Sequence, residues 1–306
     1  MIEDCLTQFV PLTLSDQEHI NGFLKLTDYR LSRYNFLNLW MYSKWIPIYY
    51  RQHDDILLLS SYYHGHYFAY MPLCRKEKLE QAFSLIEEHF STCALPMIYA
   101  CFEDEYTDYI LKNHPSFEKK AYRDSSDYLY EVARFRTFGG KKLQKKRNHL
   151  NAFYGLYPDY QYQEISPENI EQVKDFVSKW YNRKTAEFLD YDQEANYEVL
   201  NNYFALDCQG ACIIIDKQVR GFIIATRQHG DTVQINIEKG DEEHRGIYQA
   251  LLKEFLNRNY PEAIYMNRED DLGLENLRKA KLSYYPDLII DNYRVCEKDL
   301  HVDYEK

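Results

Sequence analysis

Two polar segments that follow expected β-strands carry the residue types best suited to catalysis. Glu238 and Lys239 end the apolar alternation of residues 232–237, and Asn267 and Arg268 follow the strand expected at residues 263–266. In open α/β sheets, the crevice at the carboxyl ends of the strands is the usual ligand site. The sequence therefore predicts a site at this edge, with a carboxylate and two cations available for proton transfer and for stabilising negative charge.

The second of these segments also has a structural interpretation. Residues 267–273 form a charged loop that leads into the helix expected at residues 274–281. Asp271 would then cap that helix, because a carboxylate at a helix N-terminus accepts hydrogen bonds from free backbone N–H groups. This interpretation explains Asp271, but it explains Asn267 and Arg268 less well.

A basic run interrupts an otherwise acidic chain. The formal net charge is -11, yet residues 134–147 hold seven Lys or Arg, and no Asp or Glu lies between Glu131 and Asp159. This local reversal of charge predicts a surface for a polyanion: a tRNA, a phosphorylated headgroup or a nucleotide cofactor. Arg245 adds a cation at the start of the helix expected at residues 246–259, where free backbone amides also favour anions.

The basic run is expected to form a helix over residues 139–153. Leu143, Leu150 and Phe153 recur at helical spacing and form one apolar stripe. Arg147 falls on or beside this stripe, so it faces the protein unless its guanidinium extends past the stripe into water. The residues expected to bind tRNA or phosphate are Lys142, Lys145, Lys146, Arg147 and Asn148, together with Arg245.

Bulk properties exclude several other classes. Hydrophobic residues make up 45% of the chain, which predicts a folded protein. There is no secretory signal pattern, and no stretch approaches the roughly 18 apolar residues of a membrane span. Seven scattered cysteines without a CxxC pair predict reduced thiols in a cytoplasmic protein. His64 and His66 lack further ligands at suitable spacing, so no metal site is expected.

The expected elements follow the same order in the two halves of the chain. In each half a three-strand meander precedes a helix, a strand, a second helix and a closing strand, and the meanders are expected at residues 45–71 and 211–238. This order predicts an α/β protein with mixed sheets, built from two similar units. We place the units at residues 1–135 and 136–306, with the basic helix of residues 139–153 leading into the second.

The chain resembles the C-terminal family of phosphatidylglycerol lysyltransferases, over nearly its whole length. That family looks like a tandem pair of GNAT acyltransferase units and is related to the Fem-type aminoacyltransferases. Four motifs carry the resemblance: Gly140-Lys141-Lys142-Leu143-Gln144-Lys145-Lys146-Arg147-Asn148-His149-Leu150-Asn151-x-Phe153, Ile237-Glu238-Lys239, Gly246-Ile247-Tyr248-Gln249, and Asn267-Arg268-Glu269-Asp270-Asp271-Leu272-Gly273-Leu274-Glu275-x-Leu277-Arg278-Lys279-Ala280-Lys281.

The resemblance implies transfer of an aminoacyl group from charged tRNA to an acceptor. The acceptor offers an amine or a hydroxyl and is a small molecule, a peptide or a lipid headgroup. Full-length lipid lysyltransferases also carry a large membrane domain without a counterpart in these residues, so phosphatidylglycerol is the less expected acceptor. Aminoacyl-tRNA is then a co-substrate, and no other cofactor is expected.

The start of the helix near Gly246 argues against coenzyme A. Ordinary GNAT enzymes hold the coenzyme A pyrophosphate on a loop that resembles [QR]-x-x-G-x-[GA]. When its first glycine is aligned with Gly246, Glu243 occupies the basic position and Tyr248 the small one. A carboxylate repels pyrophosphate, and a phenol ring crowds the backbone approach.

Within aminoacyl transfer, five residues are expected to serve the reaction. Glu238 is the candidate base, or it holds the aminoacyl ammonium. Lys239 and Arg268 neutralise the oxyanion or the terminal phosphate, and Asn267 and Tyr284 orient the acceptor. Two alternatives remain open: a coenzyme A-dependent N-acyltransferase, and a protein of the same fold that binds tRNA or other RNA without catalysis.

Overall fold

The chain forms two compact units. The computed structural model describes residues 6–183 and 189–300. Unit 1 contains the residues up to Asp127, with Asp270–Gly273 and the segment from Ile290 onward. Unit 2 contains Tyr128–Glu269 and Leu274–Ile289.

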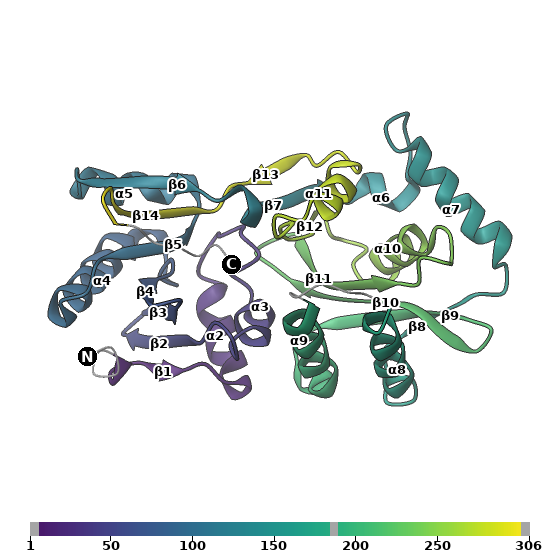
Figure 1. Cartoon of the computed structure of the whole chain (residues 1–306), viewed down its shortest axis with the longest axis horizontal. Coiled ribbons are helices and arrows are strands. Elements are labelled where there is room, and N and C mark those ends of the chain that lie inside the picture. The colour runs from purple at the N-terminus through teal and green to yellow at the C-terminus, as the bar shows by residue number, and fades with distance from the viewer. Residues whose placement is uncertain (1–5, 184–188, 301–306) are drawn as a thin grey trace. The chain divides into compact units, whose positions relative to one another are not determined.

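Unit 1 is built on a mixed seven-stranded sheet (Figure 1). Its strands, in the order in which they pair, are β1 (Val10–Pro11), β2 (Ile48–His53), β3 (Ile56–Tyr63), β4 (His66–Ala69), β5 (Ile98–Phe102), β14 (Tyr293–Glu297) and β6 (Phe117–Ala121). Its helices are α2 (Gln17–Leu24), α3 (Phe36–Met41), α4 (Leu79–Cys93) and α5 (Asp104–Asn113).

Unit 2 is built on a second seven-stranded sheet. In pairing order its strands are β13 (Leu288–Ile290), β7 (Asp127–Glu131), β12 (Tyr265–Asn267), β11 (Thr232–Gly240), β10 (Gln218–Arg227), β9 (Gln209–Ile215) and β8 (Gln161–Glu164). Its helices are α6 (Ala133–Thr137), α7 (Gln144–Leu156), α8 (Ile170–Tyr181), α9 (Leu189–Asn201), α10 (Ile247–Arg258) and α11 (Glu275–Leu282).

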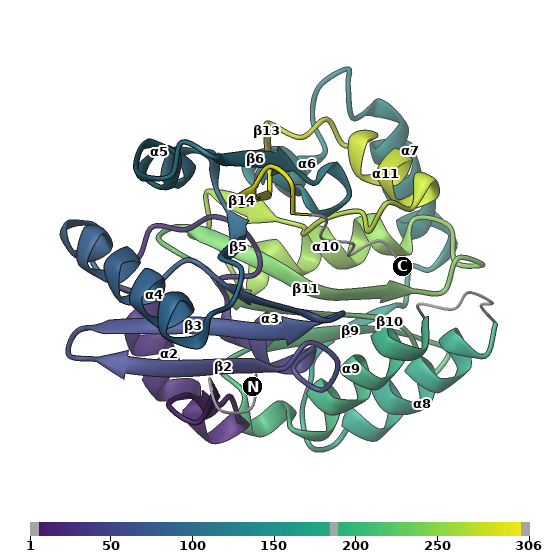
Figure 2. The ribbon, with the colours of Figure 1, turned by 60° about the vertical axis from the view of Figure 1, so that its left-hand side comes forward.

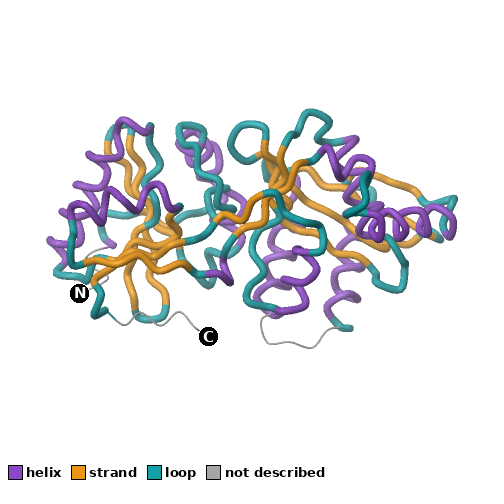
Figure 3. The backbone as a smooth tube through the Cα atoms, turned by 90° about the horizontal axis from the view of Figure 1, so that it is seen from above, coloured by secondary structure: helices purple, strands orange, loops and turns teal. Residues whose placement is uncertain are grey.

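Helices cover both faces of the unit 2 sheet. In Figures 1 and 2, α8 and α9 lie on one face and α10 on the other, and Figure 3 shows helices packed along the strands in both units. Strand β9 is buried at every position after Gln209, as expected for a strand without a solvated face. The core on the α10 face also receives α6 and α7, through Phe135, Leu150 and Phe153.

Each sheet is completed by a strand from the other half of the chain. In both sheets, four strands pair antiparallel, the fourth pairs parallel with the fifth, and the fifth pairs antiparallel with a sixth. The sixth strand of unit 1 is β14, from the C-terminal end, whereas the sixth strand of unit 2 is β7, from the N-terminal half. The units are therefore not contiguous in sequence, unlike the predicted stretches 1–135 and 136–306, because backbone pairing assigns these strands.

The basic run forms two helices rather than one. The short helix α6 ends before a turn in which Phe138 and Gly140 have positive φ, and α7 begins only at Gln144. The start predicted at residue 139 is therefore wrong, because two positive-φ residues interrupt helical geometry. The predicted apolar stripe is confirmed, since Leu143, Leu150 and Phe153 are all buried.

The prediction that the cysteines are reduced thiols holds only in part. Cys93 is disulfide-bonded, so the prediction that every thiol is reduced is wrong at this residue. Spacing detects paired cysteines that are close in sequence, whereas a disulfide also joins distant residues. The free thiols are Cys74, Cys101, Cys208, Cys212 and Cys296.

Within residues 6–183 and 189–300, no helix is long and apolar enough to cross a bilayer, and no three potential metal ligands cluster.

Candidate active site

The candidate site lies where the parallel strands β11 and β12 stop pairing. Their register ends at Gln234 and Asn267, although β11 continues to Gly240. Glu238 lies on the part of β11 beyond its pairing with β12, and Arg268 directly follows β12. The side chains of Glu238 and Arg268 meet beyond the last paired residues.

Glu238 and Arg268 form a buried ion pair. Arg268 Nη2 lies 2.5 Å from Glu238 Oε2, and the two side chains are only 13% and 9% exposed. Burial acts to lower the pKa of Arg268, but the Glu238 carboxylate together with Tyr284 and Tyr130 raises it above its usual value. Among the described residues, Glu238 Oε1 and Arg268 Nη1 have no hydrogen-bond partner. One acceptor and one donor of the buried pair are thus left unsatisfied by the described residues.

Tyr284 forms one wall beside this ion pair. Its ring centre lies 4.9 Å from Arg268 Cζ, and the ring stacks on Phe135 of α6. Gln249 on α10 donates a hydrogen bond of 2.6 Å to the Tyr284 hydroxyl. Burial raises the pKa of this phenol, with Arg268 acting in the opposite direction. Tyr284 is therefore a neutral side chain at physiological pH, held from two sides.

Lys146 approaches the same tyrosine from α7. Its Nζ lies 3.9 Å from the centre of the Tyr284 ring, and its side chain is half-buried. Burial first, and then the charges of Arg268 and Lys145, lower the pKa of Lys146 to about 8, while Glu238 opposes them. Lys146 and Arg268 thus lie beside the same Tyr284 ring, which the sequence did not indicate.

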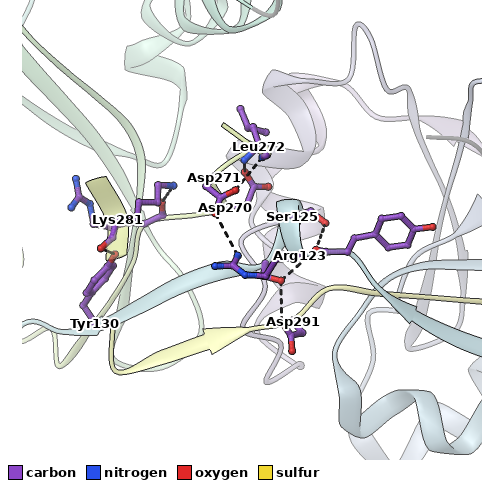
Figure 4. Close-up of polar contacts among 12 residues, drawn as sticks. Arg123, Ser125, Tyr130, Asp270, Asp271, Leu272, Lys281 and Asp291 are labelled. Carbon is purple, nitrogen blue, oxygen red and sulfur yellow. Dashed lines mark hydrogen bonds and ion pairs between the residues drawn. The ribbon is translucent and has the colours of Figure 1, made fainter. Parts of the chain in front are cut away.

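Backbone contacts fix the position of Arg268. Its N–H donates to the Tyr128 carbonyl at 3.0 Å, which extends the pairing with β7. Its carbonyl accepts a 2.6 Å hydrogen bond from Lys281 Nζ. The Tyr130 hydroxyl in turn donates to the Lys281 carbonyl at 2.9 Å, and Figure 4 shows these two residues together. Spacing alone does not identify Lys281 or Gln249 as supporting residues, although both fall within motifs of the family resemblance.

Two predicted catalytic residues lie outside this cluster. Lys239 points to the opposite face of the sheet, where its Nζ lies 2.6 Å from Asp192 and 4.7 Å from the Trp180 ring centre. Consecutive strand residues face opposite sides, so Glu238 and Lys239 do not share a site. Asn267 is fully buried, and its Oδ1 accepts a hydrogen bond from the Glu269 N–H at 2.7 Å. That contact stabilises the turn after β12.

Asp271, in unit 1, stabilises a loop rather than the helix. Its Oδ1 accepts from the Gly273 N–H at 3.0 Å, and its Oδ2 lies 3.4 Å from Arg123 Nη1 (Figure 4). Helix α11 begins later, with Leu274 as its N-cap residue. The interpretation of Asp271 as the helix cap is therefore wrong, because its carboxylate is occupied before the helix starts.

The arginines of the basic run have structural partners. Arg134 bonds to Asp287 and to the Tyr285 carbonyl. Arg147 Nη1 donates to the Phe138 and Gly140 carbonyls at 2.7 and 3.1 Å, so it faces the protein as predicted. Arg136 donates to carbonyls at and beyond the end of α10, those of Leu256, Tyr260, Pro261 and Ala263.

Four members of the predicted tRNA-binding set are exposed. Lys142, Lys145, Asn148 and Arg245 are exposed. Lys142 Nζ also lies 5.5 Å from the ring centre of Tyr285, the residue after Tyr284. These side chains belong to the same unit as the ion pair and remain the candidates for phosphate contacts.

Helix α7 passes closely over the start of α10. Gly246 has φ +89°, and a Cβ on it would lie 2.1 Å from the His149 carbonyl oxygen and 3.0 Å from Phe153 Cβ. Only glycine tolerates both this backbone angle and this approach. Tyr248, aligned above with the small residue of a coenzyme A loop, donates its hydroxyl to the Gly240 carbonyl at 3.1 Å.

A pocket lies on the α8 face of unit 2. The pocket has a volume of about 240 Å³ and is lined by residues that include Lys179, Trp180, Lys217 and Arg220. Asp241 is buried there, with Arg183 Nη1 at 3.3 Å and Arg220 Nη1 at 3.6 Å. This pocket is on the face toward which Lys239 points.

The strand order and the two sheets define a tandem GNAT-like fold, as predicted. The family model for the C-terminal region of phosphatidylglycerol lysyltransferases matches residues 24–296. The chain therefore belongs to that family. An L-PGS from Bacillus licheniformis has a similar fold, with a TM-score of 0.67 at 15% identity, over 94% of this chain and 93% of that one.

Two further solved structures have the same fold. A conserved protein of unknown function from Bacteroides thetaiotaomicron gives a TM-score of 0.88 at 29% identity, covering 95% of this chain and 99% of that chain. The C-terminal domain of a putative lysylphosphatidylglycerol synthetase from Agrobacterium fabrum gives 0.68 at 11% identity, covering 93% and 92%.

One relative was found by sequence comparison with curated proteins. An uncharacterized protein of Mycoplasmoides gallisepticum is 30% identical over 183 residues, which is 57% of this chain and 57% of that protein. The chain thus matches little more than half the length of this relative.

Proposed function

We propose that the protein transfers an aminoacyl group from charged tRNA to an acceptor amine or hydroxyl. The observation that carries this proposal is the buried Glu238–Arg268 pair, in which one oxygen and one N–H group have no hydrogen-bond partner among the described residues. The ester of an aminoacyl-tRNA is already activated. The enzyme therefore needs mainly to position the acceptor and to stabilise an oxyanion.

The free atoms of the ion pair match the two ends of an aminoacyl group. Glu238 Oε1 accepts hydrogen bonds, so it suits the α-ammonium. Arg268 Nη1 donates, so it suits the carbonyl oxygen, whose negative charge grows during attack. Because the pair is only 13% and 9% exposed, these interactions occur with little competition from water.

Exposed lysines support tRNA as the donor. Lys142 and Lys145 lie in the segment that also carries Lys146, which reaches the Tyr284 ring. A phosphate backbone bound by these lysines would bring the 3′ end of the tRNA near the ion pair. Helix α7 covers the start of α10, where an ordinary GNAT enzyme binds pyrophosphate, which further disfavours coenzyme A.

The family and the fold relatives make phosphatidylglycerol one acceptor to test. A radiolabelled mixture of aminoacyl-tRNAs is incubated with the protein and with three acceptor sets: soluble amines, soluble hydroxyl compounds, and vesicles containing phosphatidylglycerol. We expect label to move to one set, and Glu238→Gln and Arg268→Lys to reduce the rate at least about tenfold.

The matched control is an ion pair of the same type at the surface of unit 2. Arg227 pairs with Glu262, and both side chains are at least half exposed. Arg227→Lys and Glu262→Gln should leave the transfer rate unchanged. Binding of tRNA without transfer to any acceptor would instead favour a non-catalytic protein, and transfer from acetyl-coenzyme A would favour an N-acyltransferase.

A further inference from the structure

Lys146 and Arg268 place two basic groups at one phenol ring. Lys146 Nζ lies 3.9 Å and Arg268 Cζ 4.9 Å from the centre of the Tyr284 ring. Arginine cannot give up its proton in a protein, whereas lysine can. In this cluster the pair of like charges is therefore relieved only when the Lys146 amine becomes neutral.

The titratable and charged groups around Lys146 come from several helices and strands of unit 2. The titratable or charged groups that act on it or lie beside it are Tyr284 after α11, Arg268 after β12, Glu238 on β11, and Lys145 and His149 on α7. Gln249 on α10 is uncharged and holds the Tyr284 hydroxyl. Burial and the cations together bring the pKa of Lys146 to about 8 despite the opposing carboxylate.

Resting on the function proposed above, we propose that Lys146 is the proton-transfer group of the reaction. The neutral amine removes the proton from the acceptor as its oxygen or nitrogen attacks the aminoacyl carbonyl. When the tetrahedral intermediate collapses, the bond to the tRNA ribose oxygen breaks. The Lys146 ammonium then returns the same proton to that oxygen, so the cycle consumes no further acid or base.

Lys146 suits this task better than Glu238. One oxygen of Glu238 is committed to Arg268, whose charge is permanent. The remaining oxygen is the only acceptor of the pair available for the aminoacyl ammonium. Lys145 is the adjacent lysine of α7, but it is exposed. Lys146 alone among the basic residues of α7 contacts the Tyr284 ring.

The first test measures the pKa of the Lys146 amine in the absence of substrate. The lysines of the full chain are reductively methylated with ¹³C-formaldehyde, and each dimethylamine signal is followed by NMR from pH 6 to 11. Lys146→Arg assigns the signal of Lys146, and Lys145→Arg assigns a reference signal on the same helix. We expect the Lys146 signal to titrate near its shifted pKa of about 8. Titration of the Lys146 signal at the usual lysine value of about 10.4 would overturn the proposal.

The second test measures transfer. Lys146→Arg keeps a positive charge over the ring but cannot act as a neutral base, so we expect a loss of about a hundredfold or more. The wild-type rate should rise with pH through about 8, because the base form is the active one, whereas the variant should lose this rise. Lys146→Ala should regain part of its rate with added ethylamine. A wild-type rate for Lys146→Arg would contradict the proposal.

Lys253 provides a matched control. It is half-buried on α10 and lies 5.2 Å from the centre of the Tyr154 ring, so it resembles Lys146 in packing but not in its neighbours. Lys253→Met should keep the wild-type rate. Absence of transfer by the wild-type protein would count against the proposed function itself, while the NMR titration would still judge the Lys146 amine.

Discussion

A tyrosine hydroxyl joins the two parallel strands in unit 1, whereas an ion pair joins them in unit 2. In unit 1, the Tyr34 hydroxyl bridges the chain beyond the parallel contact of β4 and β5. It accepts from the Met71 N–H at 2.9 Å and donates to the Cys101 carbonyl at 2.6 Å. In unit 2, the Glu238–Arg268 ion pair occupies the corresponding place between β11 and β12.

The two bridges differ in whether all of their polar atoms have hydrogen-bond partners. Tyr34 uses its hydroxyl for both strands and is 4% exposed. The ion pair keeps Glu238 Oε1 and Arg268 Nη1 without partners among the described residues. Buried polar groups are normally satisfied, and exceptions need an explanation. Under the proposed function these two atoms bind the aminoacyl group, so unit 2 carries the chemistry.

Arg268→Met tests this comparison with the largest expected effect. The substitution leaves the Glu238 carboxylate buried without its partner, so the free energy of unfolding should fall by roughly 3–5 kcal/mol. Aminoacyl transfer should be lost. Urea denaturation gives the first quantity, and the transfer assay gives the second.

The double variant Glu238→Met/Arg268→Met separates stability from function. Replacing both charges with apolar side chains of similar size is often neutral or stabilising, so this variant should recover much of the lost stability. It should still be inactive. An active double variant would show that the ion pair is only a structural bridge, as Tyr34 is.

Tyr34→Phe is the corresponding change in unit 1. Loss of the hydroxyl leaves the Met71 N–H and the Cys101 carbonyl without this partner, which should lower the free energy of unfolding by about 1–3 kcal/mol. Transfer by the folded protein should stay at the wild-type rate, measured well below the unfolding temperature. A variant that keeps its stability but loses transfer would place part of the chemistry in unit 1.

The sequence predicted the parts of the fold that depend on local pattern. Apolar periodicity identified the buried face of α7 at Leu143, Leu150 and Phe153, and the order of elements predicted two similar units. The pairing of β7 with the unit 2 sheet and of β14 with the unit 1 sheet could not be predicted in this way. Which sheet a strand joins depends on backbone pairing between distant segments, which the local sequence of a strand does not specify.

The candidate site was predictable only in part. The rule for strand ends identified Glu238 and Arg268, which the structure brings together. Because consecutive strand residues face opposite sides of a sheet, the choice of Glu238 would have excluded Lys239 from the same site. Lys146 and Tyr284 lie far apart in sequence, so their contact follows from the packing of α7 and not from spacing.

The smallest expected effect concerns the basic residues of unit 2 and separates exposed lysines from Lys146. Lys142 and Lys145 are exposed, so each should bind phosphate and release a counterion. Lys142→Ala and Lys145→Ala should each reduce the slope of log K against log salt by about 0.7 to 0.9, measured by fluorescence anisotropy of labelled tRNA between 50 and about 300 mM NaCl.

Lys146→Met should change the slope little, because this amine faces the Tyr284 ring at 3.9 Å. Lys112→Ala, at an exposed lysine of unit 1, controls for the change in net charge. If Lys142→Ala and Lys145→Ala leave the slope unchanged while Lys146→Met reduces it, Lys146 is a phosphate contact, and the division of roles along α7 is wrong.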